Sequence, residues 1–109
     1  MVIKRFDICL VNLDPTVGSE IKKTRPVVIV SPDSMNLSRL KTIIVAPMTS
    51  KVRDNFPTRI NLTFKNRNGQ VALDQIRSID RGRIIKKLGT VGNKIQDEIL
   101  NLLSIMFSP

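Results

Sequence analysis

A run of β-branched residues at positions 25–31, Arg-Pro-Val-Val-Ile-Val-Ser, constrains the fold of this chain more than any other feature. Val and Ile pack well on a pleated surface and lose rotamer freedom in a helix, so the run predicts a buried strand. Pro26 moves the preceding residue out of the helical region of backbone space. We therefore expect Arg25 to be extended, at the entrance of this strand.

Similar apolar segments, separated by Pro, Gly and Asn, predict the other strands of a sheet. The segment 6–13 has apolar residues on both faces, which is typical of a strand covered on both sides. Pro47 is expected to end the next long strand. The remaining expectations are a loop at 14–24, a short helix at 35–40, strands at 42–48, 58–64 and 70–73, a hairpin turn at 65–69, and short strands or turns at 79–85 and 86–91.

The last segment has the clearest helical pattern. Asn93 is expected to cap it, with Gln96 completing a capping box and Asp97 and Glu98 in the first turn, where the helix dipole favours acids. Apolar residues recur on one face at positions 95, 99, 102, 103 and 106. The whole pattern predicts a mainly β (α+β) fold: a compact antiparallel β-barrel with a C-terminal helix, in one domain spanning 1–109.

The charge balance points to a polyanionic partner. The chain has 18 Lys and Arg against 9 Asp and Glu, a net charge of +9. Nucleic acid is favoured over an anionic membrane, and a merely soluble basic protein is the alternative. Histidine is absent, which excludes His-based metal sites and His-activated nucleophiles.

The single cysteine, Cys9, allows no intramolecular disulfide. This usage fits a reducing, cytoplasmic setting. The N-terminus lacks the apolar run of a signal peptide, and no stretch is long enough to cross a membrane, so no membrane partner is expected.

Arg25 and Thr49 are the first candidate site residues. If their strands are antiparallel neighbours, the start of one lies beside the end of the other, and the two side chains meet at one rim of the sheet. A guanidinium beside a hydroxyl and a backbone N–H is a plausible phosphate cradle. Ser50 follows directly. Taken alone, Arg25 is better explained as a surface Arg or one paired with Asp or Glu, and Thr-Ser after a strand is usually a turn or cap.

Two further segments carry chemistry-bearing side chains. The loop Gly18-Ser19-Glu20, with Lys22 and Lys23, suits closing over a nucleic-acid strand, or is an ordinary solvated loop. In the segment 74–80, Gln75 and Arg77 suit RNA binding. There Asp74 or Asp80 could act as an acid or base, or could pair with Arg77, Arg81 or Arg83.

Read in order, these segments resemble the MazF/PemK family of toxin endoribonucleases, and its PemK-like branch most. The pieces are Asp-Ile-Cys-Leu-Val-Asn-Leu-Asp-Pro-Thr-Val-Gly-Ser-Glu-Ile-Lys-Lys-Thr-Arg-Pro-Val-Val-Ile-Val-Ser-Pro-Asp at 7–33, Val-Ala-Pro-Met-Thr-Ser at 45–50, Phe-Pro-Thr-Arg at 56–59, Leu-Asp-Gln-Ile-Arg-Ser-Ile-Asp at 73–80 and Lys-Lys-Leu-Gly-Thr at 86–90. Any one piece is weak, but the ordered set is specific and covers nearly the whole chain.

The resemblance implies an SH3-like barrel shared with the gyrase toxin CcdB, a homodimer, and an RNA groove along the dimer interface. It implies sequence-selective cleavage of single-stranded RNA without a metal or cofactor, giving 2′,3′-cyclic phosphate and 5′-hydroxyl ends. It also implies an acidic MazE/PemI-like antitoxin as partner. The family's catalytic Arg falls on Arg25 and its catalytic Thr on Thr49. A carboxylate with an acid or base role falls on Asp74.

Two departures from the family pattern matter. Some members have Gln-Gly-Gly where this chain has Ile21-Lys22-Lys23, and some have a His near Ser19, which this chain lacks. A His-based acid step therefore does not transfer. Glu20 or Asp74 is left as the acid or base, since Arg is a poor proton acceptor. The rival functions are a CcdB-like gyrase poison and an RNA-binding module without catalysis.

Overall fold

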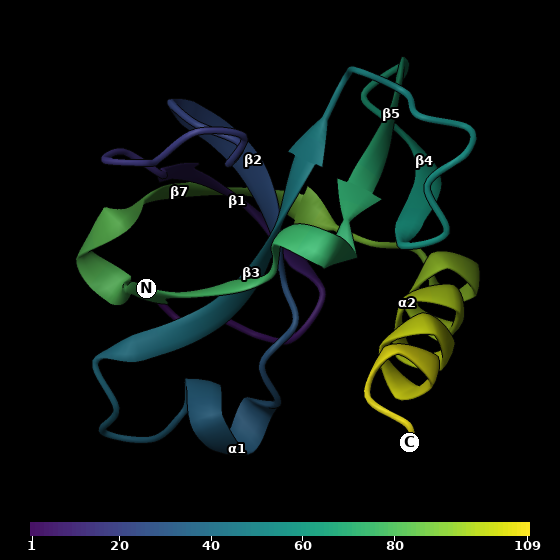
Figure 1. Cartoon of the computed structure of the whole chain (residues 1–109). Coiled ribbons are helices and arrows are strands. Elements are labelled where there is room, and N and C mark those ends of the chain that lie inside the picture. Colours follow the sequence, from purple (N-terminus) through teal and green to yellow (C-terminus); the bar gives the residue numbers. More distant parts are fainter.

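The computed structural model describes all residues, 1–109, as a curled antiparallel sheet with one long helix at its side (Figure 1). The strands and helices are β1 (Asp7–Asn12), β2 (Thr24–Ile29), α1 (Asp33–Asn36), β3 (Thr42–Thr49), β4 (Arg59–Phe64), β5 (Arg67–Ala72), the 3₁₀ turn η1 (Leu73–Gln75), β6 (Arg77–Asp80), the 3₁₀ turn η2 (Arg81–Arg83), β7 (Ile84–Thr90) and α2 (Asn93–Met106). The predicted fold class is confirmed. No helix is long and apolar enough to cross a membrane.

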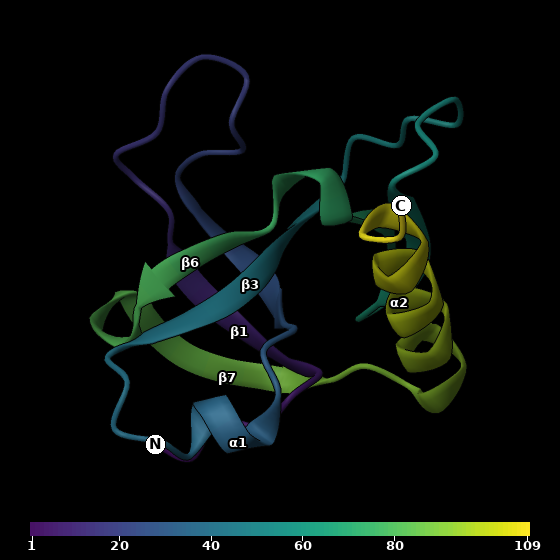
Figure 2. The same ribbon diagram turned by 60° about the horizontal axis from the view of Figure 1, so that its bottom comes forward.

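Strand β3 is the centre of the sheet. The strand order is β4-β5-β3-β2-β1-β7, and β6 also pairs with β3. Along β3, residues 42–45 pair with β6, residues 45–47 with β2, and residues 48–49 with β5. The sheet therefore curls around β3, and Figure 2 shows β1, β3, β6 and β7 closing into a half-barrel.

Two apolar cores lie on opposite faces of this curled sheet. Ile8 and Val28 face a core shared with β4, β5 and α2, in which Ile99 is fully buried. Cys9 and Val27, their neighbours along the same strands, face a second core inside the half-barrel. The prediction that the first strand is covered on both sides is thus confirmed, as is the packing of the apolar face of α2.

Pro47 does not end β3, which was the expectation, because the strand continues to Thr49. On the side of β3 away from β2, the pairing with β6 stops at Val45 and that with β5 starts at Met48. Pro47 lies in this gap, where a missing N–H is tolerated.

The predicted hairpin turn at 65–69 is wrong in length. The turn is only Lys65-Asn66, with φ angles of 52° and 63°, and Phe64 pairs directly with Arg67. Two consecutive positive φ angles are those of a type I′ turn, which matches the twist of the flanking strands. Gly69 lies within β5 and has another role, described below.

The helices also differ from expectation at their ends. Helix α1 spans Asp33–Asn36 rather than 35–40, and its buried Asn36 side chain donates to the Ser31 carbonyl at 2.8 Å. Helix α2 has Gly92 at its cap position without a side-chain cap, so the capping box is not formed. The Gln96 amide instead donates to the Val91 carbonyl at 2.7 Å, and no acidic residue lies in the first turn.

The chain between 79 and 91 consists of the end of β6, the turn η2 and one long strand. Asp80 accepts a hydrogen bond from the Gly82 N–H at 2.7 Å, and this bond caps η2. Strand β7 then runs without a break from Ile84 to Thr90, where short strands or turns were expected. Asp80 is therefore part of a turn and does not pair with Arg77, Arg81 or Arg83.

Candidate active site

Strands β2 and β3 bring Arg25 and Thr49 together. The two strands are antiparallel, with Val27 opposite Pro47, so two residues further along Arg25 faces Thr49. Both residues are half-buried and line the same two cavities. The structure thus places the two residues at the same rim of the sheet, where both line the same cavities.

The Arg25 guanidinium is available to bind an anion. Its Nε donates to the Lys22 carbonyl at 2.9 Å, which fixes the side chain against the β1–β2 loop. The only two ion pairs in the structure are Arg59–Asp74 and Lys87–Asp7, so no carboxylate neutralises Arg25. Its terminal nitrogens keep their capacity for a phosphate.

The Thr49 hydroxyl is oriented by its own loop. Its oxygen accepts a hydrogen bond from the Lys51 N–H at 3.1 Å. The hydroxyl hydrogen remains free, so Thr49 is able to donate to a phosphate oxygen bound by Arg25.

A cavity of about 510 Å³ extends from this pair, and we call it the Arg25 groove. Its walls come from the β1–β2 loop, the β3–β4 loop and η1. Five cations and two acids line it: Lys22, Arg25, Lys51, Arg53 and Arg59 against Glu20 and Asp74. Because cations predominate, the groove attracts polyanions. No group of three or more Cys, Asp or Glu is placed to hold a metal ion.

Asp74 is held by a cation that the sequence did not suggest. Both of its oxygens accept from Arg59, at 2.8 and 3.2 Å, and Thr58 donates to it at 3.0 Å. Burial raises the pKa of the Asp74 carboxyl, but the hydrogen bonds from Arg59 and Thr58 outweigh burial and hold it below its ordinary value of 3.8. Asp74 is therefore ionised at neutral pH and engaged with Arg59.

Glu20 has a freer carboxylate. One oxygen accepts from the Val17 N–H at 2.6 Å within the loop, and the other has no intramolecular partner. The side chain is exposed and lines the Arg25 groove together with Ser19 and Lys22.

Gln75 fastens the β1–β2 loop to η1. Its side-chain oxygen accepts from the Ile21 N–H at 2.6 Å, and its amide nitrogen donates to the Ser19 carbonyl at 3.4 Å. Gln75 lines the groove, as expected, but both ends of its amide are already engaged by the loop. Its first role in this structure is to hold the loop in position.

The remaining predicted site residues lie at the edges. Ser50 lines a second cavity beside Arg25 and Thr49. Arg77 lines a neighbouring hollow and donates to the Leu13 carbonyl at 3.1 Å. Gly18 and Lys23 line none of the described cavities, and both have positive φ angles, 59° and 71°, which shape the loop.

Five residues of the groove were not predicted as site residues from sequence: Ile21, Lys51, Arg53, Phe56 and Arg59. Ile21 comes from the β1–β2 loop. The other four belong to the β3–β4 connection and the start of β4. The Arg59 guanidinium lies 5.1 Å from the centre of the Phe56 ring. The available signals were the basic residues of the 49–57 loop and the family-like Phe-Pro-Thr-Arg at 56–59, neither of which says where the loop folds.

This chain is similar to known proteins in both sequence and fold. Residues 4–107 match the family model described as PemK-like, MazF-like toxin of type II toxin–antitoxin systems. Endoribonuclease EndoA of Bacillus subtilis (strain 168) is 32% identical over 110 residues, which cover 96% of this chain and 94% of that protein.

Solved structures have the same fold. The crystal structure of MazF (Form-I) from Deinococcus radiodurans superimposes with a TM-score of 0.83 at 24% identity and covers 97% of this chain and 96% of that one. The MazE–MazF (Form-II) structure from the same organism gives a TM-score of 0.77 at 24% identity, with the same coverage. Because the family model matches residues 4–107, nearly the whole chain, the chain belongs to the PemK-like, MazF-like toxins of type II toxin–antitoxin systems.

Proposed function

We propose that this protein is an endoribonuclease that cuts single-stranded RNA in the Arg25 groove. The observation that carries the proposal is the Arg25 guanidinium, free of any carboxylate partner and facing Thr49 in a groove where cations outnumber acids. The relative EndoA is named an endoribonuclease and matches over 96% of the chain.

In the reaction, the 2′-hydroxyl of the substrate attacks the adjacent phosphorus. The 2′-oxygen–phosphorus bond forms, the bond from phosphorus to the 5′-oxygen breaks, and the leaving 5′-oxygen takes up a proton. The products are a 2′,3′-cyclic phosphate and a 5′-hydroxyl. Because the substrate supplies the nucleophile, the protein needs no metal to activate water.

The protein contributes position and charge. Arg25 neutralises the charge that develops on the non-bridging oxygens, and Thr49 donates a hydrogen bond that holds the phosphate in line. Glu20 is the preferred base for the 2′-hydroxyl proton, since one of its oxygens is free. Asp74 is the weaker candidate, because both of its oxygens are bound to Arg59.

Two partners complete the proposal: a second copy of the chain and an acidic antitoxin. The groove has a cationic lining that an acidic, partly disordered chain would fit on electrostatic grounds. The Deinococcus radiodurans relative has been crystallised as a MazE–MazF pair. Occupation of the groove by such a partner would block Arg25 and stop cleavage.

The test incubates purified protein with a long single-stranded RNA in excess EDTA and maps the fragment ends. We expect discrete cuts that leave 5′-hydroxyl ends, and no cuts in DNA of the same sequence, which lacks the 2′-hydroxyl. Arg25→Ala should lower the rate about a hundredfold or more. Arg39→Ala is the matched control, because this exposed Arg lies outside the groove.

Intact RNA with folded wild-type protein would overturn the nuclease proposal. Inhibition of gyrase supercoiling would then point to a gyrase poison, and RNA binding without cleavage to a binding module. Cleavage that disappears in EDTA would keep a nuclease but refute the metal-free chemistry.

A further inference from the structure

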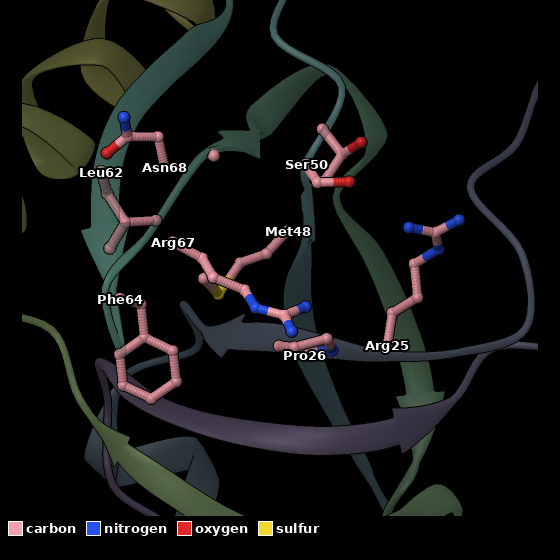
Figure 3. A pocket seen from close by; sticks show the side chains of 10 residues that line it. Arg25, Pro26, Met48, Ser50, Leu62, Phe64, Arg67 and Asn68 are labelled. Atoms are coloured by element: carbon pink, nitrogen blue, oxygen red, sulfur yellow. The ribbon is translucent and has the colours of Figure 1, made fainter.

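A second cavity, of about 230 Å³, shares Arg25 and Thr49 with the Arg25 groove, and Figure 3 shows the side chains that line it. We call it the Phe64 pocket. Strands β2 to β5 all contribute to it where the sheet bends around β3. Apolar side chains form its floor: Met48, Leu62 and Phe64. Arg67 extends into it from β5 (Figure 3), and Arg25 and Thr49 also line it.

The aromatic wall of the pocket is fixed in place. Phe64 packs against the core that contains Leu62, and its ring lies so close to Gly89 that a Cβ there would be 3.0 Å from it. The Lys65 Nζ lies over the Phe64 ring, 5.5 Å from its centre. A ring held by its surroundings offers a stacking surface without the entropic cost of ordering it on binding.

The lining excludes acids altogether. Among its ten residues are two cations, Arg25 and Arg67, and no Asp or Glu. Arg67 is exposed and its side chain makes no intramolecular hydrogen bond or ion pair, so its guanidinium is free to stack or to donate. An aromatic ring, aliphatic side chains and an unpaired guanidinium are the groups that proteins use to hold an unstacked base of single-stranded RNA.

The position of the pocket selects its occupant. A phosphate held between Arg25 and Thr49 lies on the shared rim, so the adjoining nucleotide is carried to the Phe64 pocket. A volume of about 230 Å³ is below the range of about 300–1,000 Å³ typical for drug-sized ligands, which suits a single ring system.

We propose that the Phe64 pocket binds the base of the nucleotide next to the reacting phosphate, between the Phe64 ring and the Arg67 guanidinium. The proposal rests on the RNA-cleaving function argued above. It assigns a recognition role to two residues that lie outside the Arg25 groove.

The test combines protein variants with substrates that lack one base. Wild type, Arg67→Ala, Phe64→Leu and the control Arg39→Ala are compared on an oligoribonucleotide that carries one cleavage sequence. Two further oligonucleotides have an abasic ribose immediately 5′ or 3′ of the cleaved linkage. Rates give kcat and KM, and fluorescence anisotropy gives Kd for the same oligonucleotides with a 2′-deoxyribose at the cleaved position.

On the complete substrate, we expect Arg67→Ala and Phe64→Leu each to raise KM and Kd about tenfold, with kcat nearly unchanged. For wild type, KM and Kd should rise by a similar factor on one of the two abasic substrates. On that substrate the two variants should have the same KM and Kd as wild type. Such non-additivity shows that the side chains and the missing base contact each other. Arg39→Ala should behave as wild type on every substrate.

Equal losses on complete and abasic substrates would overturn the proposal, because Arg67 would then act only as a charge and Phe64 only as a packing group. Conversion of either variant from dimer to monomer, measured by light scattering, would assign the pocket to a second copy and also overturn it. If wild type binds RNA but does not cut it, the proposed function fails, while the anisotropy cycle still decides what the pocket binds. The binding and rate data for Phe64→Leu are interpreted only if the variant still unfolds cooperatively on heating; Arg67→Ala tests the proposal independently.

Discussion

Gly69 allows β5 to approach the backbone of Thr49, and Gly69→Ala should therefore disturb catalysis from a residue without a functional group. A Cβ at position 69 would lie 2.7 Å from the Thr49 carbonyl oxygen and 3.5 Å from its carbonyl carbon. Ordinary contact begins at 3.4 Å, so the strands must separate by about 0.7 Å. The obstacle is backbone, which cannot rotate away.

The magnitude follows from this displacement. A misplacement of about 1 Å at a reacting centre can cost about a hundredfold in rate, so 0.7 Å at Thr49 should lower kcat between about 10- and 100-fold. This equals about 1.4–2.7 kcal/mol of activation free energy. Overpacking should also lower the free energy of unfolding by about 1–3 kcal/mol.

The assay measures kcat on a fluorogenic RNA oligonucleotide and thermal unfolding of the same samples. Gly92→Ala is the matched control, because nothing lies within 4 Å of a Cβ at that position and its φ is negative. The control should keep the wild-type kcat. Its free energy of unfolding should fall only slightly, because Gly92 is the N-cap residue of α2 and Ala is less favourable there. A Gly69→Ala protein with wild-type kcat and wild-type melting temperature would refute the reasoning.

Three further predictions concern the neighbouring groups. Asp74→Asn should lower the free energy of unfolding at pH 7 by about 1–3 kcal/mol, because it leaves the nearly buried Arg59 without its carboxylate. Since the folded-state pKa of Asp74 is depressed below 3.8, its stabilisation is present above that value and lost as pH falls through the folded pKa; denaturant titrations from pH 7 to pH 2 should show a shallower acid limb for the variant, and an unchanged limb would contradict the pairing. Gln75→Met should raise KM about fivefold and speed proteolysis at Lys22 and Lys23, because the loop loses two hydrogen bonds, each worth about 1 kcal/mol; equal proteolysis rates would show that Gln75 does not hold the loop. Burial, aided by the Asp7 charge and opposed by Lys87, raises the pKa of Cys9 to about 11, so the folded protein should resist a thiol reagent at pH 8 and react only after denaturation, and rapid reaction of the native thiol would contradict its burial.

The strand segments were predictable from sequence because their apolar patterns are local. The two-faced burial of β1 and the apolar face of α2 follow directly from alternation and helical spacing. The wrong predictions concern the ends of strands and helices, because contacts with residues distant in sequence determine where these elements end. Pro47 is tolerated only because β6 and β5 leave a gap along β3, and no local pattern contains that information.

The candidate site divides in the same way. Arg25 and Thr49 could be paired from sequence, because antiparallel neighbours place the start of one strand beside the end of the next. The partner of Asp74 could not, since Arg59 lies fifteen residues earlier in the chain, on another strand. The Phe64 pocket could not be predicted from the sequence either, because its lining comes from four strands that meet only where the sheet bends.

The three partners of β3 have a consequence for how the site opens. Strand β3 pairs with β6, β2 and β5 along successive segments, so its hydrogen-bonded amides should exchange with solvent only when a large part of the sheet unfolds. The β1–β2 loop is largely exposed and should exchange through small local openings. Thr49, at the end of β3 and paired with Gln70 of β5, should therefore open less readily than Glu20 in the exposed loop. A peptide that captured the loop in its open form would silence the enzyme while leaving the fold intact.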